Sequence, residues 1–592
     1  MELSVIRTPD LVVAIDVGST YSGYAWQWRT NFSSNKQNVE FNTNWGQGTP
    51  QIHKTNTAIL LKDDSTAQFG LKIVTFGYRA EHRYATICSD GKEKEEEYHL
   101  FKRFKLLLYR VTGRDGEQEP GVEDSNGILF KLSDIMALFI KAMKEDFYTK
   151  QSTTQNITNV LWVLTVPAIW SEKAKQFMRL AAEQAGIERK HLLLASEPEA
   201  AAIYCLNLPP EQQAAMNNVG TPGHCFLTVD LGGGTADLSA VRVEEDGLLR
   251  ELCCERGNLI GGQSVNDAFF QACNDDFEGT EWKKKFTEAT PFEMMKIEHE
   301  FEKCKLAIGA EEMDETIQLP LPRSVRDSFR TGKIKVNRSQ TRISITGEED
   351  LRFETSFVRD HLFDQACKMI NQVIETVLEN QKDIQTVVLV GGFAESPIVQ
   401  ENIKSLLQQK YPSVAVVVPT SPFRAVLMGA VLYGHDMFIY RSRVSRATYG
   451  VKGISVFDEK KHDESKKWFN TDTGINYCKD IFDIHVEKGQ SVVLKEQTGG
   501  KNYIPLYKNQ KSITLPLFVA DTCGPSEGNV MYTTHPSCKK VGEIRVDLSD
   551  TDAPNSERKV CVKMIYGGSQ LSVIATELTT GKEYNAEIHF NA

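Results

Sequence analysis

The chain has 592 residues, of which 41% are hydrophobic, and carries a formal net charge of −11 at pH 7. This length is sufficient for about three or four domains of ordinary size, each with its own apolar core. The acidic balance argues against nucleic acid or an anionic membrane as the main partner, because either would require a dominant basic face. The longest apolar stretch, from Val160 to Trp170, is too short to span a bilayer, and the N-terminus lacks a signal-peptide pattern. We therefore expect a cytoplasmic protein without a membrane span.

The first informative motif is a glycine-containing turn near the N-terminus. The apolar run 11–15 leads into Asp-Val-Gly-Ser-Thr-Tyr at 16–21, and more strand-like residues follow. This order predicts a β-hairpin whose tip faces a ligand. Gly18 allows backbone N–H groups to approach phosphate oxygens, and the neighbouring hydroxyl groups add donors. Asp16, at the end of the first strand, places a carboxylate where Mg²⁺ or its waters would lie.

Two strands and two helices are predicted in the next informative region. A buried strand at 160–166 is followed by a helix from about Glu172 to Ala185, and a second strand at 191–195 runs into another helix. Pro198 suits the first position of that helix and leaves Glu197 at its mouth. A carboxylate there is either a partner of the helix dipole or a catalytic group, and the motif alone favours the dipole.

The phosphate-type turn recurs in the second half of the chain. Another apolar run, 225–229, enters Asp-Leu-Gly-Gly-Gly-Thr-Ala-Asp at 230–237, again followed by strand-like sequence. A single turn of this kind is common at ordinary hairpin tips, but a pair in similar settings indicates a duplicated nucleotide-binding device. The carboxylates of Asp16 and Asp230 would face one ion, and Thr235 would add a hydroxyl donor.

Two later segments complete the pattern. An amphipathic helix places Glu302 and Lys305 together on one face, an arrangement that an exposed ion pair would also explain. A strand at 385–390 then enters the pair Gly391 and Gly392 before the next helix. These glycines would let a flat adenosine lie close to the main chain. No P-loop, dinucleotide-binding or protein-kinase signature occurs in the chain.

Taken in order over about Leu11 to Gly434, these motifs resemble the superfamily of actin, hexokinase and the 70-kilodalton heat-shock chaperones. The segment 389–397, Leu-Val-Gly-Gly-Phe-Ala-Glu-Ser-Pro, is most similar to the divergent branch called heat shock 70 kDa protein 12. The chain is identified as a member of that family.

The resemblance implies an α/β fold with a duplicated actin-like ATPase core, in which lobes 1–210 and 211–434 surround a nucleotide cleft. Beyond this core, short alternating runs separated by turn residues predict a β-sandwich-like domain at 435–592. It resembles the peptide-binding sandwich of the chaperones, but the chain ends in a strand near Phe590 without a helical lid. The joining segment 440–446 is basic rather than acidic and leucine-rich.

The resemblance also assigns roles to individual residues. The implied catalytic group comprises Glu197, which would orient the attacking water, with Lys105, Asp230 and Thr235; Lys102 is an alternative to Lys105 as the lysine that contacts phosphate. The implied Mg²⁺ ligands are Asp16, Asp230 and Asp237. The implied nucleotide contacts are Gly18, Ser19, Thr20, Tyr21, Gly232, Gly233, Gly234, Thr235, Gly261, Gly262, Glu302, Lys305, Gly391, Gly392 and Phe393.

Several positions depart from the chaperone pattern. Glu395 stands where typical chaperones have an arginine that packs on adenine, and Phe423 replaces an acidic residue near the ribose. Gly309 replaces a serine, and Gln263 and Ser264 follow the glycine pair where the chaperones carry acids. Nucleotide affinity or base choice can therefore differ from that of typical chaperones.

These implications favour a slow ATPase that uses ATP, ADP and Mg²⁺ and couples its nucleotide state to the binding of protein clients. Clients or signalling partners would bind the C-terminal β domain, with co-chaperones or exchange factors as further partners. One alternative is an ATP-sensing adaptor or signalling scaffold with vestigial hydrolysis. A small-molecule kinase on the same fold has less support, because the sequence offers no sugar-binding signature beside Glu197 and Thr235.

Overall fold

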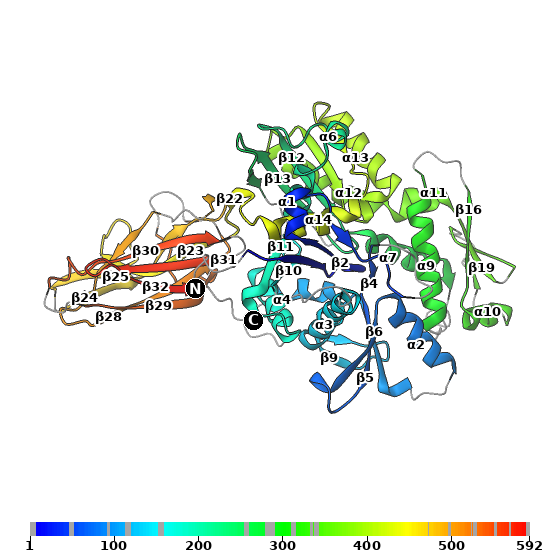
Figure 1. Ribbon diagram of the computed structural model, residues 1–592, viewed down its shortest axis with the longest axis horizontal. Coiled ribbons are helices and arrows are strands. Elements are labelled where there is room, and N and C mark those ends of the chain that lie inside the picture. The colour runs from blue at the N-terminus through cyan, green and yellow to red at the C-terminus, as the bar shows by residue number, and fades with distance from the viewer. Residues whose placement is uncertain are drawn as a thin grey trace. The chain divides into compact units, whose positions relative to one another are not determined.

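The described part of the chain forms two compact units (Figure 1). The large unit comprises Thr8–Ala240 and Glu255–Asp436, and the small unit comprises Val241–Cys254 and Met437–Ala592. The computed structural model describes residues 8–587 apart from 47–52, 91–94, 113–119, 152–158, 254–259, 279–290, 310–314, 332–334, 337–341, 348, 472, 495–498, 523, 525–529, 550–552 and 568–569.

The first sheet of the large unit is built around a hairpin and two parallel strands. Its order is β11 (Leu192–Ser196), β10 (Val160–Val166), β1 (Leu11–Asp16), β2 (Tyr21–Trp28) and β3 (Glu40–Phe41), and β4 (Thr55–Asn56) pairs with the beginning of β2. β1 runs antiparallel to β2 and parallel to β10. Every residue of β1 is buried, as expected for a strand between two layers of helices.

Helices cover both faces of this sheet. They are α3 (Leu132–Gln151), α4 (Glu172–Gln184) and α14 (Ala425–His435), and α14 also packs on α5 (Glu197–Leu206). Val13 joins the core formed with α3 and α4, whereas its neighbour Val12 faces α14, where a Cβ on Gly434 would lie 2.4 Å from it. A Cβ on Gly429 would lie only 1.6 Å from the carbonyl oxygen of Ala200, so α14 and α5 approach closely because position 429 is glycine.

The second sheet of the large unit repeats the order of the first. It contains the hairpin of β12 (Cys225–Leu231) and β13 (Ala236–Val243), followed on the other side by the parallel strands β20 (Thr386–Val390) and β21 (Ala415–Val417). The associated helices are α12 (Asp364–Asn380) and α13 (Pro397–Lys410). The strands and helices that the sequence predicts around both turns are thus confirmed, with shifts of one to three residues at some ends.

Two further groups of elements in the large unit bring α2 and α9 into contact (Figure 1). The first group is β5 (Ala58–Asp63), β6 (Leu71–Phe76), β7 (Tyr98–Lys102) and α2 (Tyr78–Asp90), and the second is α7 (Gly262–Asp276), α9 (Pro291–Ala307), β16 (Thr316–Pro320), β18 (Ser344–Thr346) and β19 (Asp350–Glu354). Smaller elements are α1 (Arg29–Ser34), β8 (Gly121–Glu123), β9 (Leu129–Lys131), α6 (Pro210–Ala215), β15 (Phe277–Glu278), α10 (Arg323–Arg330) and β17 (Lys335–Val336).

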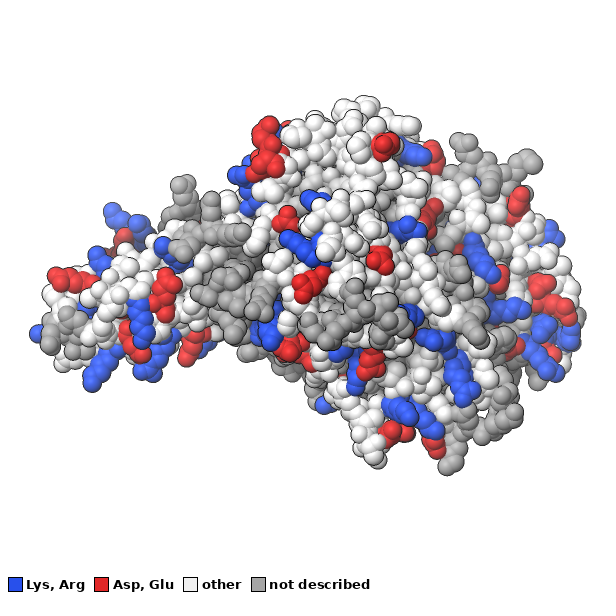
Figure 2. All heavy atoms as spheres, in the orientation of Figure 1, with Lys and Arg blue, Asp and Glu red and all other residues white. Residues whose placement is uncertain are grey.

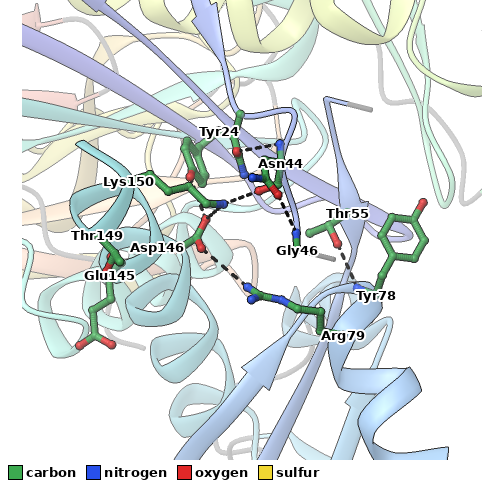
Figure 3. A network of polar contacts seen from close by, with 11 residues as sticks. Tyr24, Asn44, Gly46, Thr55, Tyr78, Arg79, Glu145, Asp146, Thr149 and Lys150 are labelled. Atoms are coloured by element: carbon green, nitrogen blue, oxygen red, sulfur yellow. Dashed lines mark hydrogen bonds and ion pairs between the residues drawn. The ribbon is translucent and has the colours of Figure 1, made fainter. Parts of the chain in front are cut away.

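A polar network anchors the start of α2 to the first sheet (Figure 3). Tyr24 on β2 donates a 2.8 Å hydrogen bond from its hydroxyl group to Asp146 on α3, and Lys150 lies 2.6 Å from the same carboxylate. Arg79 in the first turn of α2 forms an ion pair with Asp146 at 3.7 Å. The residue before it, Tyr78, donates its backbone N–H to Thr55 Oγ1 at 3.0 Å. The Asp146 carboxylate and the Thr55 hydroxyl group therefore tie the helices α2 and α3 to the strands β2 and β4.

The small unit is dominated by two antiparallel sheets. One has the order β24 (Lys467–Asn470), β25 (Ile475–Val486), β23 (Thr448–Val456), β28 (Ser512–Ala520) and β29 (Cys538–Asp547), and the other has the order β27 (Lys501–Tyr503), β30 (Val560–Gly567), β31 (Gln570–Glu577) and β32 (Lys582–Glu587). Val451 and Leu517 from the first sheet share one core with Val562 and Val573 from the second. The unit also contains β14 (Leu249–Cys253), β22 (Tyr440–Val444) and β26 (Ser491–Val493). The end of the predicted last strand at Phe590 lies outside the described residues.

The surface carries charges of both signs. On the face seen in Figure 2, basic and acidic side chains are interspersed over the described residues. None of the helices in the described ranges is both long enough and apolar enough to cross a membrane.

Candidate functional site

A cavity of about 350 Å³ lies within the large unit and receives residues from both hairpin tips. Its volume falls in the range of ordinary small-molecule sites. The predicted site residues that line it are Asp16, Gly18, Ser19, Thr20, Tyr21, Lys105, Glu197, Asp230, Gly232, Gly233, Thr235, Gly262, Glu302, Lys305, Gly391, Gly392 and Phe393. Residues spread over most of the large unit's sequence are thus brought to one place.

Two hydrogen bonds hold the first hairpin tip at Gly18. The backbone N–H of Gly18 donates to Ser22 Oγ at 3.2 Å, and Thr57 Oγ1 donates to the Gly18 carbonyl oxygen at 2.7 Å. A Cβ on Gly18 would lie 2.0 Å from the carbonyl oxygen of Tyr21. Only glycine fits at this turn, which keeps its backbone close to the cavity.

The two hairpin tips pack against each other, and the glycines of the second tip make this possible. A Cβ on Gly233 would lie 2.2 Å from Thr20 Oγ1, and one on Gly234 would lie 2.8 Å from Ser19 Oγ. A Cβ on Gly261 would lie 2.5 Å from the carbonyl oxygen of Gly232. Gly234 and Gly261 are absent from the cavity lining, and their place in the structure is this close packing.

Two lysine–carboxylate pairs lie at the cavity. Lys105 Nζ donates to Glu197 Oε1 at 2.6 Å, and Lys54 Nζ donates to Asp16 Oδ2 at 2.6 Å. The other oxygen of Asp16 accepts a 2.8 Å hydrogen bond from Thr165 Oγ1. Glu197 is the first residue of α5, where the helix dipole also favours a negative charge.

The carboxyl groups of the cavity differ in acidity. Burial raises the pKa of Glu197 to about 7, against the lowering effect of Lys105. Burial, followed by the charges of Glu197 and Asp237, raises the pKa of Asp230 well above its usual range. Burial alone would also raise the pKa of Asp16, but Lys54 and Lys105 outweigh it and hold that pKa below its ordinary value. Asp230 is therefore the carboxyl group whose ionisation an added cation would assist most.

A buried polar cluster forms another part of the lining. Lys305 Nζ donates to the Gly262 carbonyl oxygen at 2.9 Å, to Asn266 Oδ1 at 3.0 Å and to Glu302 Oε2 at 2.7 Å. Asn266 Nδ2 donates to the same oxygen of Glu302 at 3.0 Å. The Lys305 side chain is 1% exposed, so the alternative of a surface ion pair between Glu302 and Lys305 is wrong.

The glycine pair after β20 has two distinct positions. Gly391 has a φ of +90°, and a Cβ there would lie 2.4 Å from Asp230 Oδ1. A Cβ on Gly392 would meet nothing within 4 Å, although this residue lines the cavity. Gly391 thus permits a tight turn beside Asp230, whereas Gly392 leaves open space for a ligand.

The sequence profile of the family described as Hsp70 protein matches residues 91–439, which is more than half of the chain. The chain belongs to the Hsp70 protein family. It is 27% identical to heat shock 70 kDa protein 12A of Mus musculus over 98% of this chain and 91% of that protein. Heat shock 70 kDa protein 12B of Homo sapiens is likewise 27% identical, over 98% of this chain and 91% of its own. The chaperone protein DnaK of Mycoplasmopsis synoviae (strain 53) is 25% identical over 62% of this chain and 58% of its own. The predicted membership of the protein 12 branch is confirmed.

The structure shows where Lys105, Lys102 and Asp237, to which the Hsp70 resemblance assigns possible roles, lie relative to the cavity. Lys105 lines the cavity, whereas Lys102 forms an ion pair with Glu298 at 3.3 Å and is not part of the lining. Asp237 is buried outside the lining, and its Oδ1 accepts a 3.1 Å hydrogen bond from the backbone N–H of Ile169. A metal role for Asp237 stays a prediction.

The cavity of this Hsp70-family chain also contains residues that the sequence analysis did not select. They are His53, Lys54, Tyr78, Asn266, Leu306 and Val426, and the departing positions Gln263, Glu395 and Phe423 join them. Asn266 lies one helical turn after Gly262, so helix periodicity places both residues on the same face of α7 and could have predicted that Asn266 lines the cavity. Lys54 lay far from both turns in the sequence and carried no such signal.

The residues fit a nucleotide with Mg²⁺. The glycine turns leave backbone close to the cavity, and Gly392 leaves space beside it. Within the described ranges, no group of three or more His, Cys, Asp or Glu side chains forms a metal site by itself. Mg²⁺ commonly takes one or two carboxylates and completes its shell with waters and phosphate oxygens, and Asp230 suits that use.

Proposed function

We propose that the large unit binds ATP in its cavity and hydrolyses it slowly with the help of Mg²⁺. The observation that carries the proposal is the Lys105–Glu197 pair, with 2.6 Å between Nζ and Oε1, beside two glycine-rich tips that pack together. The tips would cradle the phosphates through backbone N–H groups and the hydroxyl groups of Thr20 and Thr235. Membership of the Hsp70 family supports the same ligand.

The chemistry proposed for the chain's own residues is modest. Glu197 in its ionised form would orient the attacking water and accept its proton, and a pKa of about 7 suits a general base. Lys105 would hold Glu197 in place and neutralise charge on the transferred phosphoryl group. Bound Mg²⁺, held by Asp230 together with phosphate oxygens, would supply further charge neutralisation. Hydrolysis of this kind depends mainly on positioning and electrostatics, which the buried pair can provide.

The finer architecture belongs to the same proposal. The repeated sheet order supports an actin-like core with lobes 1–210 and 211–434. The two antiparallel sheets that share one core support a sandwich at 435–592, and in this proposal the sandwich would bind protein clients. Coupling requires that ATP and client change each other's affinity for the chain. Measuring the affinity of an unfolded client protein with and without ATP tests this, and equal affinities would contradict coupling.

Equilibrium binding of ATP by the full chain tests the cavity itself. Gly233→Ala should weaken ATP binding by about tenfold or more, because the added Cβ would lie 2.2 Å from Thr20 Oγ1 and separate the two tips. Gly542→Ala is the matched control, since its Cβ would make only a 3.9 Å contact with Leu517. Absence of ATP binding by the native chain would refute the proposal. Binding without turnover by the native chain would favour the ATP-sensing adaptor.

A further inference from the structure

Lys54 brings an ammonium group to the carboxylate that the family resemblance assigns to Mg²⁺. Its Nζ lies 2.6 Å from Asp16 Oδ2, and both residues line the cavity. The position of Lys54 is fixed by the sheet, because the next residue, Thr55, pairs with Ser22 on β2. A Cβ on Gly23 would lie 2.7 Å from the carbonyl oxygen of His53, so this segment lies directly on the first hairpin.

In this ion pair both oxygens of Asp16 are engaged, whereas Lys54 keeps donors available for a ligand. Each oxygen of Asp16 already accepts a hydrogen bond, one from Thr165 and one from Lys54. An ammonium group has three donors, and Asp16 accounts for one of them. The Lys54 side chain keeps 20% of its surface exposed while that of Asp16 keeps 7%, so the cation is the more accessible partner.

The negative charge of the cavity lining is the reason why an additional lysine would favour the binding of phosphates. Five acidic side chains, Asp16, Glu197, Asp230, Glu302 and Glu395, line this cavity, and a polyphosphate would add more negative charge. Lys105 and Lys305, which also line the cavity, form ion pairs with Glu197 and Glu302, so together they offset only two of these five carboxylates. Lys54 supplies a third cation within the same space, where a low local dielectric strengthens its effect.

We propose that the ammonium group of Lys54 contacts the phosphates of a bound nucleotide directly, from the Asp16 side of the cavity. This contact makes nucleotide binding less dependent on Mg²⁺. The inference rests on the proposed function, because it requires that the cavity binds a nucleotide. It differs from the family assignment of Asp16, since Asp16 here positions a lysine. A divalent ion bound directly to Asp16 would have to displace that ammonium group or lie beside it against charge repulsion.

The test is ATP affinity of the full chain in excess Mg²⁺ and in excess EDTA. Removal of Mg²⁺ should lower the ATP affinity of the native chain by less than about tenfold. Relative to the native chain, Lys54→Met should lose at least about ten times more ATP affinity in EDTA than in Mg²⁺. Lys54→Arg keeps the charge and should restore part of the EDTA affinity. Lys62→Met, which removes an exposed lysine paired with Glu97 at 3.4 Å, should behave as the native chain does.

A second variant guards against misfolding. Lys54→Met combined with Asp16→Asn removes both charges, so no buried carboxylate is left without its partner, and it should show the same selective loss in EDTA. Equal losses in Mg²⁺ and EDTA, or none, for a folded variant would overturn the role of Lys54 while ATP binding by the native chain stands. If the native chain binds ATP in neither condition, the proposed function fails as well.

Discussion

The ammonium group of Lys105 lies 2.6 Å from Glu197 Oε1, and both side chains are buried at the cavity. Lys105 also lies 5.4 Å from the centroid of the Trp170 ring, a distance at which a cation–π contact adds to its fixation. Burial raises the pKa of Glu197 to about 7, and Lys105 limits this rise. Lys105 therefore fixes the position of Glu197, the proposed general base, and also influences its pKa.

Removing this lysine should impair turnover far more than binding. Lys105→Met should lower single-turnover hydrolysis by about 100-fold or more, because a preorganised charge at the reacting group is lost. The pKa of Glu197 should rise above 7, so the remaining activity should require a higher pH. Lys102→Met is the matched control and should stay close to the native rate, since Lys102 pairs with Glu298 outside the lining. Equal losses in the two variants would contradict the assignment of Lys105.

The adjacent glycines after β20 should respond differently to the same substitution. Gly391→Ala should lower the free energy of unfolding by about 1–3 kcal/mol, because φ is +90° and the new Cβ would lie 2.4 Å from Asp230 Oδ1. Gly392→Ala should change it by less than about 0.5 kcal/mol, since its Cβ would meet nothing within 4 Å. Denaturant unfolding and ATP binding on both variants check this. Indistinguishable unfolding curves for the two would contradict the described turn.

Much of this architecture could be predicted from the sequence because it follows local rules. The continuous apolar runs of the buried strands, the glycine turns and the proline at the start of α5 each leave a signal within about ten residues. Glu197 was placed correctly at a helix mouth for that reason. The repeat of the turn at 16–21 and 230–237 also predicts that two distant segments meet, and residues of both line one cavity.

Long-range pairing could not be read in the same way. Nothing near Lys54 in the sequence indicates that it meets Asp16, because the contact depends on β4 pairing with β2. Likewise, the spacing of Glu302 and Lys305 allowed a surface pair, and only the packing of α9 on α7 shows that Asn266 and the Gly262 carbonyl group bury that lysine.

Acid should destabilise the large unit through His435. This ring stacks on Phe32 with centroids 4.4 Å apart, and Nε2 lies 3.1 Å from the carbonyl oxygen of Gln27. Burial, with a smaller effect of Arg29, lowers its pKa to about 4. Because the unfolded chain protonates this histidine near pH 6.5, its contribution is fully present above that pH and is lost as the pH falls through about 4.

The magnitude can be measured as a difference between two chains. Between pH 7 and pH 5 the free energy of unfolding of the large unit should fall by on the order of 2 kcal/mol more in the native chain than in His435→Gln. Glutamine retains a donor for the Gln27 carbonyl oxygen but does not titrate. Denaturant unfolding of both chains at the two pH values gives the comparison, and parallel pH dependences would contradict the burial of a neutral ring at this position.

The most direct test of the central claim is single-turnover hydrolysis of Mg-ATP by the full chain and by Glu197→Gln, with ATP binding measured on the same samples. The substitution preserves the size of the side chain but removes the proton acceptor. We expect both chains to bind ATP, the native chain to turn it over with a rate that rises as the pH passes through about 7, and the variant to be slower by about 100-fold or more. Native turnover that is absent, or unchanged in Glu197→Gln, would contradict the claim that this cavity is an ATPase site.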